Sequence, residues 1–188
     1  MKKIYNIYSE YTPNPNVLKF VSNIDLFDST KEFFEKPNQV EFPLIYSIFN
    51  FPFVVKVFLG KNYISIEKTK NLDWIEFSSE IRTFIQQSLN DGIKVSTVKI
   101  NENLSKKSLR TKTEIEQQIE KIIDKEIRPF IQMDGGEIEL ISFENGIVKV
   151  TLKGACRGCP SSVSTLKNGI ENRLKSVIPG KIKEVVSV

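Results

Sequence analysis

Hydrophobic and polar positions alternate along most of the first half of the chain, and this pattern predicts β-strands. Strands are expected at Ile4–Ser9 and Val17–Ser22, on either side of a turn that holds two prolines and two asparagines. A second strand pair, Val54–Leu59 and Tyr63–Glu67, is expected around the glycine at position 60.

Two helices interrupt this alternation. A short helix is expected over Leu44–Asn50, after a proline that suits a first helical turn. A longer one opens at Asp73 and ends at Asp91-Gly92, with its apolar stripe at Trp74, Phe77, Ile81, Phe84, Ile85 and Leu89. Helices and strands together predict a small α+β domain over residues 1–95.

The last part of the chain predicts a second α+β domain, over residues 113–188. Thr113 and Glu116 form a capping box before a helical run of isoleucines, and Pro129 is expected to bend or break that helix. Strands are expected at Glu137–Phe143, Ile147–Lys153 and Ile182–Val188. A helix is expected before the last strand, with its stripe at Val163, Leu166, Ile170, Leu174 and Val177.

The net charge of +4 comes from one segment between the two domains. Residues 1–95 and 113–188 each carry 11 basic and 11 acidic residues. Residues 96–112 carry five basic residues and one acidic residue, without an aromatic side chain. A nucleic-acid surface normally masses its basic residues on a folded face beside stacking aromatics. We therefore interpret residues 96–112 as a polar, basic linker and expect no nucleic-acid partner.

Composition excludes several classes of site. The chain has 188 residues and no histidine, which removes Ser-His and Cys-His nucleophile pairs and His-ligated zinc. Only two cysteines are present, too few for a disulfide framework. No apolar run approaches the roughly 18 residues of a membrane span, so no membrane insertion is expected.

The remaining chemical handle is the segment Gly154-Ala155-Cys156-Arg157-Gly158-Cys159-Pro160, which lies between an expected strand and an expected helix. A two-residue spacer allows both sulfurs to face one metal centre. The helix N-terminus and Arg157 favour thiolates or an anionic metal–thiolate cluster. We expect the loop to leave both sulfurs accessible, away from the core.

Four interpretations of Cys156 and Cys159 are open at this point: structural cysteines, a thiol–disulfide pair, zinc shared between two chains, and an iron–sulfur cluster. The glycine-bracketed loop is a poor core position, and the flanking pattern lacks the βαβ unit of thioredoxin-like proteins. Iron–sulfur ligation is favoured. A fully thiolate-ligated cluster takes four cysteines and one chain supplies two, so a second copy or outside thiols must complete it.

Several stretches match a known family pattern. In the second domain they are residues 127–130 (IRPF), 133–136 (MDGG), 146–150 (GIVKV), 154–162 (GACRGCPSS) and 165–171 (TLKNGIE). In the first they are residues 12–16 (TPNPN), 18–20 (LKF), 58–61 (FLGK) and 63–66 (YISI). Residues 113–188 thereby resemble the NifU C-terminal (Nfu-type) iron–sulfur domain, and residues 1–90 resemble the N-terminal domain that accompanies it.

The resemblance implies a protein that binds and transfers iron–sulfur clusters and is not an enzyme. It implies a [4Fe–4S] cluster between the two subunits of a homodimer, with Cys156 and Cys159 as the ligands from each chain, and cluster donors and recipient apoproteins as partners. The turn Asp134-Gly135-Gly136 is interpreted as a helix-to-strand connection without a role in this site. Neither a signal peptide nor an Arg-rich presequence precedes the first strand, so a cytoplasmic, bacterial protein is expected, with a processed organellar protein as the alternative.

Overall fold

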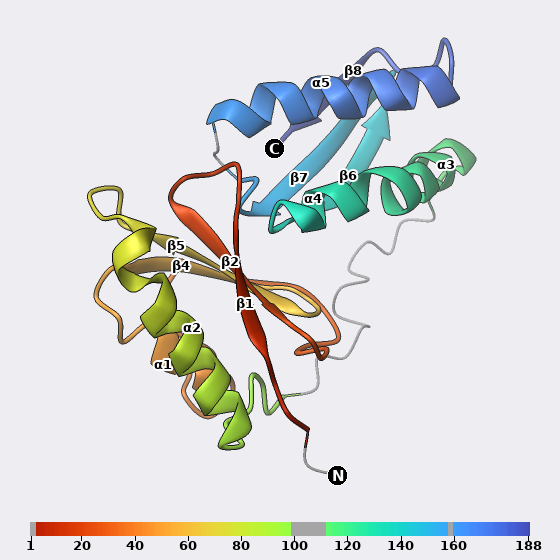
Figure 1. The fold of residues 1–188 in the computed structure, drawn as a ribbon. Coiled ribbons are helices and arrows are strands. Elements are labelled where there is room, and N and C mark those ends of the chain that lie inside the picture. The colour runs from red at the N-terminus through yellow and green to blue at the C-terminus, as the bar shows by residue number, and fades with distance from the viewer. Residues whose placement is uncertain (1–2, 99–111, 158–159) are drawn as a thin grey trace. The chain divides into compact units, whose positions relative to one another are not determined.

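The computed structural model describes residues 3–98, 112–157 and 160–188. It divides into two compact units, Met1–Leu104 and Ser105–Val188 (Figure 1). Each unit contains helices and a sheet, which confirms the predicted α+β class. The sequence-based boundaries at residues 95 and 113 stay a prediction, because most of the segment between them lies outside the described residues.

The first unit is a five-stranded antiparallel sheet in the order β1-β2-β5-β4-β3. Its elements are β1 (Ile7–Tyr11), β2 (Val17–Ser22), β3 (Lys31–Phe33), α1 (Pro43–Ile48), β4 (Val54–Leu59), β5 (Tyr63–Lys68) and α2 (Trp74–Asn90). One sheet face carries Leu18, Phe20, Val57, Ile64 and Ile66. These side chains form a single core with buried residues of α1 and α2.

Most elements of this unit lie where the sequence predicts them. The strand predictions for β2 and β4 are confirmed, and Asp73 caps α2 by accepting a hydrogen bond from the Ile75 amide at 3.0 Å. The first strand was wrong by about three residues at its start, because sheet pairing begins only where Ile7 meets Ser22. Strand β3 was missed because three residues are too few to show a period.

The second unit is a three-stranded sheet in the order β6-β7-β8, with β6 and β7 antiparallel and β7 and β8 parallel. Its elements are α3 (Glu114–Ile122), a π-helical turn η2 (Ile123–Ile127), α4 (Arg128–Met133), β6 (Gly136–Glu144), β7 (Ile147–Gly154), α5 (Pro160–Val177) and β8 (Glu184–Ser187). Val148, Val150 and Leu152 alternate onto the buried face of β7. There they share one core with isoleucines of α3, η2 and α4 and with Ile170 and Leu174 of α5.

The α-helix is interrupted before Pro129, the residue that was predicted to bend or break it. The five residues of η2 form a wider π turn, and α4 then begins with the proline in its first turn. A proline lacks an N–H and its ring crowds the preceding turn, and the π turn accommodates both effects without ending the helical path. The predicted capping box is also confirmed, because the Thr113 amide donates to Glu116 Oε2 at 2.8 Å and the Glu116 amide to Thr113 Oγ1 at 3.3 Å.

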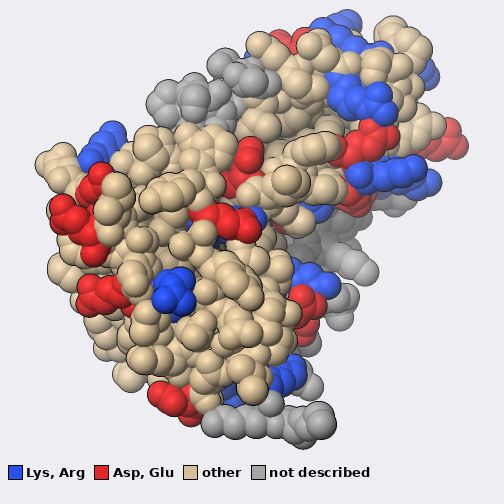
Figure 2. Space-filling view, in the orientation of Figure 1, with Lys and Arg blue, Asp and Glu red and all other residues tan. Residues whose placement is uncertain are grey.

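Charged side chains of both signs are interspersed on the face shown in Figure 2. In the second unit, several charged side chains pair across elements. Lys167 of α5 reaches Glu184 of β8 at 2.9 Å, and Arg173 of α5 pairs with Glu126 of η2. The described helices include none that is long and apolar enough to cross a membrane.

Glu171 joins α5 to β8 and makes this packing sensitive to acid. Its carboxylate pairs with Lys175 at 2.5 Å and accepts a hydrogen bond from the Val185 amide at 3.0 Å. The Lys175 hydrogen bond, followed by the Val185 amide, holds the pKa of Glu171 below its ordinary value of 4.5. A carboxyl with a lowered folded-state pKa stabilises the fold above the unfolded-state value and loses that contribution as the pH falls through the folded-state value.

We therefore expect Glu171→Gln to lower the stability of the second unit at pH 7 by less than about 1 kcal/mol, because the ion pair is largely solvated. The difference from the unsubstituted protein should diminish as the pH falls through the lowered pKa of the wild-type carboxyl and disappear once that carboxyl is protonated. Amide hydrogen exchange at Val148 and Val150 across this pH range measures the effect. Glu144→Gln is the control, because Glu144 lies 3.9 Å from Lys149 and makes no contact between α5 and β8. A Glu171 variant that keeps the full wild-type pH dependence would contradict the prediction.

Candidate metal centre

The segment that leaves β7 toward α5 is fixed by backbone contacts with the turn before β6. Gly154 ends β7 at a φ of 65° and pairs with Gly136 across the ladder. The Ala155 amide donates to the Gly135 carbonyl at 3.2 Å, and the Arg157 amide donates to the Gly154 carbonyl at 3.2 Å. These bonds close a turn around Cys156 and set the position of its side chain.

Cys156 is buried. Only 2% of its surface is exposed, and it belongs to the core cluster of the second unit, with Ile131, Ile138 and Leu152. The expectation that the loop leaves this sulfur accessible is therefore wrong. The residues between the cysteines show loop composition, but the turn at Gly154 directs the first cysteine back over the end of the sheet.

Gly136 makes this arrangement possible. A Cβ built on Gly136 would lie 2.7 Å from Cys156 Sγ and 2.7 Å from the Lys153 carbonyl oxygen. Real Cβ atoms essentially never approach other atoms so closely, and the carbonyl belongs to the sheet ladder and is not free to move. The first residue of β6 must therefore be glycine for the thiol to occupy its place.

The turn Asp134-Gly135-Gly136 is the helix-to-strand connection that the sequence predicts, and it is also one wall of the cysteine site. Gly135 adopts a φ of 78°, and its amide donates to the Gln132 carbonyl at the end of α4. Its carbonyl holds Ala155 and its neighbour Gly136 contacts Cys156. The interpretation that this turn plays no part in the site underestimated it. The second of the two glycines was the sequence signal for this role. The turn requires glycine only at Gly135, which has a positive φ, so the glycine that follows it has another cause.

A half-buried ion pair between α4 and β6 holds the same turn. Glu137 follows Gly136, and its carboxylate pairs with Arg128 of α4 and accepts a hydrogen bond from Gln132 Nε2 at 3.0 Å. The Arg128 guanidinium also donates to the Ile138 carbonyl at 2.9 Å and to Asp124 Oδ1 at 2.8 Å. Burial alone would lower the pKa of Arg128, but the hydrogen bond to Asp124 and the charges of Glu137 and Asp124 raise it above its ordinary value. The network fixes α4 against β6 and so fixes the wall of the thiol site.

The structure places one of the two predicted ligands. Cys159 lies outside the described residues, as does Gly158, and α5 begins at Pro160 as predicted. Arg157 is exposed, and the first turn of α5 carries no acidic residue. Within residues 3–98, 112–157 and 160–188, no group of three or more His, Cys, Asp or Glu side chains could hold a metal ion.

Comparison with known proteins assigns the chain to a family. Residues 119–186 match the model of the NifU-like domain, and residues 7–92 match the model named scaffold protein Nfu/NifU N terminal. A NifU-like protein of Schizosaccharomyces pombe is 36% identical over 97% of this chain and 72% of its own length. This chain belongs to the NifU-like (Nfu) family.

Another relative and one solved structure are also similar to this chain. Each comparison covers a smaller share of the relative or of this chain. The protein named NFU1 iron-sulfur cluster scaffold homolog, mitochondrial, of Drosophila persimilis is 33% identical over 95% of this chain and 64% of its own length. The chain therefore spans somewhat less than two thirds of that relative. The solution structure of a NifU-like protein from Saccharomyces cerevisiae has a TM-score of 0.45 and 22% identity, over 51% of this chain and 87% of that one.

The close approach of Gly136 to the Cys156 sulfur predicts what one added methyl group at position 136 would do. Gly136→Ala should destabilise the second unit by about 1–3 kcal/mol, because either the Cys156 side chain or the ladder at Lys153 must shift. Gly169→Ala is the matched control. Position 169 lies in α5 with nothing within 4 Å of an added Cβ, so that substitution should stabilise by about 0.5–1 kcal/mol.

Urea unfolding followed by circular dichroism measures both variants. Trp74 is the only tryptophan and lies in the first unit, so its fluorescence should follow an unchanged transition. If Gly136→Ala is as stable as the unsubstituted protein, the close contact with Cys156 does not constrain the site.

Proposed function

We propose that the protein is a non-enzymatic iron–sulfur scaffold and carrier. It binds a [4Fe–4S] cluster between two copies of the chain through Cys156 and Cys159 and passes the cluster to recipient apoproteins. The observation that supports this proposal is the Cys-x-x-Cys motif in a chain of the NifU-like family, with its first cysteine directly after β7 and beside the turn before β6. A relative similar over 95% of this chain bears the name of an iron–sulfur cluster scaffold.

The charges around the segment suit an anionic cargo. The N-terminus of a helix carries partial positive charge, and α5 extends 18 residues from Pro160 without an acidic residue in its first turn. Arg157 adds a cation between the two cysteines. These groups lower the free energy of thiolates relative to thiols and of an anionic cluster relative to an empty loop.

The buried position of Cys156 adds a conformational step to loading. The sulfur is in van der Waals contact with the Gly136 backbone and has to face the iron atoms when it is a ligand. Rotation about the Cα–Cβ bond to another staggered position moves the sulfur away from Gly136 without changing the strand pairing. Loading thus exchanges core contacts of the thiol for iron–thiolate bonds, and release returns the side chain to the core.

A second copy supplies the remaining ligands. Two thiolates per chain leave two coordination positions of a four-cysteine cluster to a partner. Helix α4 ends at the turn that holds the cysteine segment, and its Phe130 and Met133 are 66% and 68% exposed. A partner that approaches the cluster covers apolar side chains beside it, which adds contact area to the two pairs of iron–thiolate bonds. A recipient then takes the cluster by replacing one pair of thiolates at a time.

A thiol–disulfide exchanger with the same two cysteines is the alternative function. Both functions place sulfurs at a helix N-terminus, so the arrangement of β7 and α5 does not separate them. They differ in what the protein does with iron and sulfide, because an exchanger needs no bound metal and reduces model disulfides.

We also propose that the cysteine-free first unit selects donors and recipients. All metal-ligating chemistry expected in the chain lies beyond residue 150, yet the first unit is a complete domain with its own core. The cellular location of the chain stays a prediction. The fly relative is named mitochondrial.

Reconstitution with iron and sulfide under anaerobic conditions tests the cargo. We expect broad visible absorption, about two irons per chain and a shift from monomer to dimer on size-exclusion chromatography, because four irons are divided between two chains. Protein that stays colourless and reduces a model disulfide would identify the exchanger instead. A cluster-loaded monomer without added thiol would overturn the shared cluster.

Substitution of the two cysteines separates ligation from folding. Cys156→Ser should abolish cluster binding and also destabilise the second unit by about 1–3 kcal/mol, because the hydroxyl is placed in an apolar core. Cys159→Ser should abolish binding too, and the visible spectrum after reconstitution measures both losses. Full iron content in either variant would remove that residue from the ligand set, and unchanged stability of Cys156→Ser would contradict its place in the core.

A further inference from the structure

Side chains of the long helix α2 cover part of the free edge of the sheet in the first unit. Strand β1 lies at one end of the sheet order, and α2 packs against it. The Tyr5 amide donates to Asn90 Oδ1 at 3.0 Å, and Asn90 Nδ2 donates back to the Tyr5 carbonyl at 3.0 Å. One helical turn earlier, Gln86 Oε1 accepts the Ile7 amide at 3.0 Å. Side-chain amides of α2 thus form hydrogen bonds with outward-facing backbone groups of the first two such residues, Tyr5 and Ile7.

The third outward-facing residue is Ser9. In an antiparallel ladder the N–H and C=O groups of alternate residues point away from the partner strand. The Ile7 amide points outward to Gln86, so Ser9 and Tyr11 point outward as well. Among the described residues, no group outside the ladder accepts a hydrogen bond from their amides. Beyond Ile7 the edge is therefore open.

Arg82 occupies the next position along the helix. It precedes Gln86 by one turn, and the spacing that places Asn90 by Tyr5 and Gln86 by Ile7 places Arg82 by Ser9. A guanidinium only donates hydrogen bonds and cannot accept the Ser9 amide. At this position the Ser9 amide and the Arg82 guanidinium are both donors. At each of the two preceding positions, a backbone amide donates to a side-chain oxygen of α2.

These groups line a surface groove of about 450 Å³ within the first unit. Its lining residues are Asn6, Ile7, Tyr8, Ser9, Arg82 and Gln86. Arg82 is half-buried and has no ion-pair partner among the described residues. The nearest acidic residue on β1, Glu10, points to the other sheet face, where it pairs with Lys19 at 2.9 Å. Helix positions three and four residues from Arg82 carry serine, isoleucine and glutamine. The groove thus presents positive charge and unused donors.

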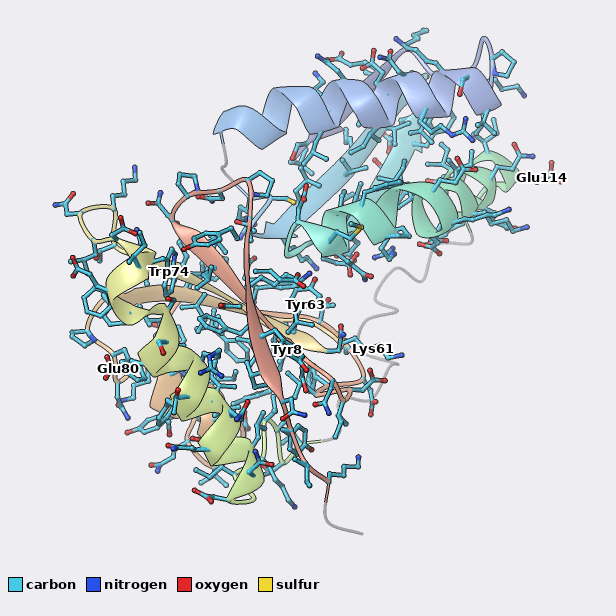
Figure 3. The ribbon with its side chains drawn as sticks, in the orientation of Figure 1. Tyr8, Lys61, Tyr63, Trp74, Glu80 and Glu114 are labelled. Atoms are coloured by element: carbon cyan, nitrogen blue, oxygen red, sulfur yellow. The ribbon has the colours of Figure 1, made fainter. Side chains whose placement is uncertain are left out.

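We propose that this groove binds an extended segment of a partner protein that carries a carboxylate side chain. The segment adds a strand to the sheet by pairing with Ser9 and Tyr11, and its carboxylate accepts hydrogen bonds from Arg82. Tyr8, which is labelled in Figure 3, is 58% exposed, and Tyr11 is 74% exposed. Both side chains flank the added strand and contact its side chains. The site lies in the first unit and requires no cluster, so it goes beyond the proposed carrier function.

A second copy of the chain is disfavoured as the occupant. Pairing of two β1 edges would bring two Arg82 side chains to one edge without a carboxylate to separate them, and like charges at short range repel. An acidic segment from another protein supplies the missing acceptors without this cost.

Titration of the full-length protein with a short model strand tests the proposal. The probe is a capped peptide of alternating valine and threonine with one central glutamate, and the matched peptide carries lysine there. We expect the amide resonances of Ser9 and Tyr11 to shift with the glutamate peptide, and binding of the lysine peptide to be at least about tenfold weaker. Methylation of the peptide backbone nitrogens that face β1 should abolish binding, because strand addition depends on main-chain hydrogen bonds.

Two variants complete the test. Arg82→Gln should weaken binding of the glutamate peptide by about tenfold, whereas Lys70→Gln, which removes an exposed charge of the same unit outside the groove, should leave it unchanged. Shifts that map away from β1, or equal affinity for the two peptides, would overturn the proposal. Concentration-dependent shifts at Ser9 and Tyr11 without peptide would identify a second copy as the occupant and would overturn it too.

Discussion

The architecture of the candidate site depends on the close approach of two segments at one end of the second sheet. Gly136 begins β6 and Gly154 ends β7, and their pairing leaves room for the Cys156 sulfur against the Gly136 backbone. A side chain at Gly136 would collide with both the sulfur and the ladder. The requirement for a bare backbone at this point connects the sheet register, the turn after α4 and the position of the thiol.

The surrounding structure supports that approach. The ion pair between Arg128 and Glu137 fixes α4 against the start of β6, and the π turn before Pro129 lets the helical path continue from α3 into α4. Glu171 holds α5 on β8, so the helix that follows the cysteine segment is fixed at its far side. The two elements that flank the cysteine segment are therefore each anchored within the second unit.

Sequence patterns were sufficient for the class of the fold and for most elements, because the apolar stripes of α2, β2, β4 and β7 follow regular periods. They were not sufficient for β3, which is too short, or for the start of β1, which is set by pairing with a distant strand. They also identified the cysteine motif, but not the burial of Cys156. That burial arises from Gly136, 20 residues earlier in the chain, and no local period encodes such a contact. The pairing of α2 side chains with the β1 edge is equally non-local.

Native mass spectrometry of the protein reconstituted under anaerobic conditions tests the central claim most directly, because it weighs chains and cluster together. The account predicts a species of two chains with the added mass of one [4Fe–4S] cluster, and loss of the cluster should return single chains. A single chain that carries its own cluster, or a dimer that persists unchanged when the cluster is removed, would contradict the claim that the cluster joins two copies.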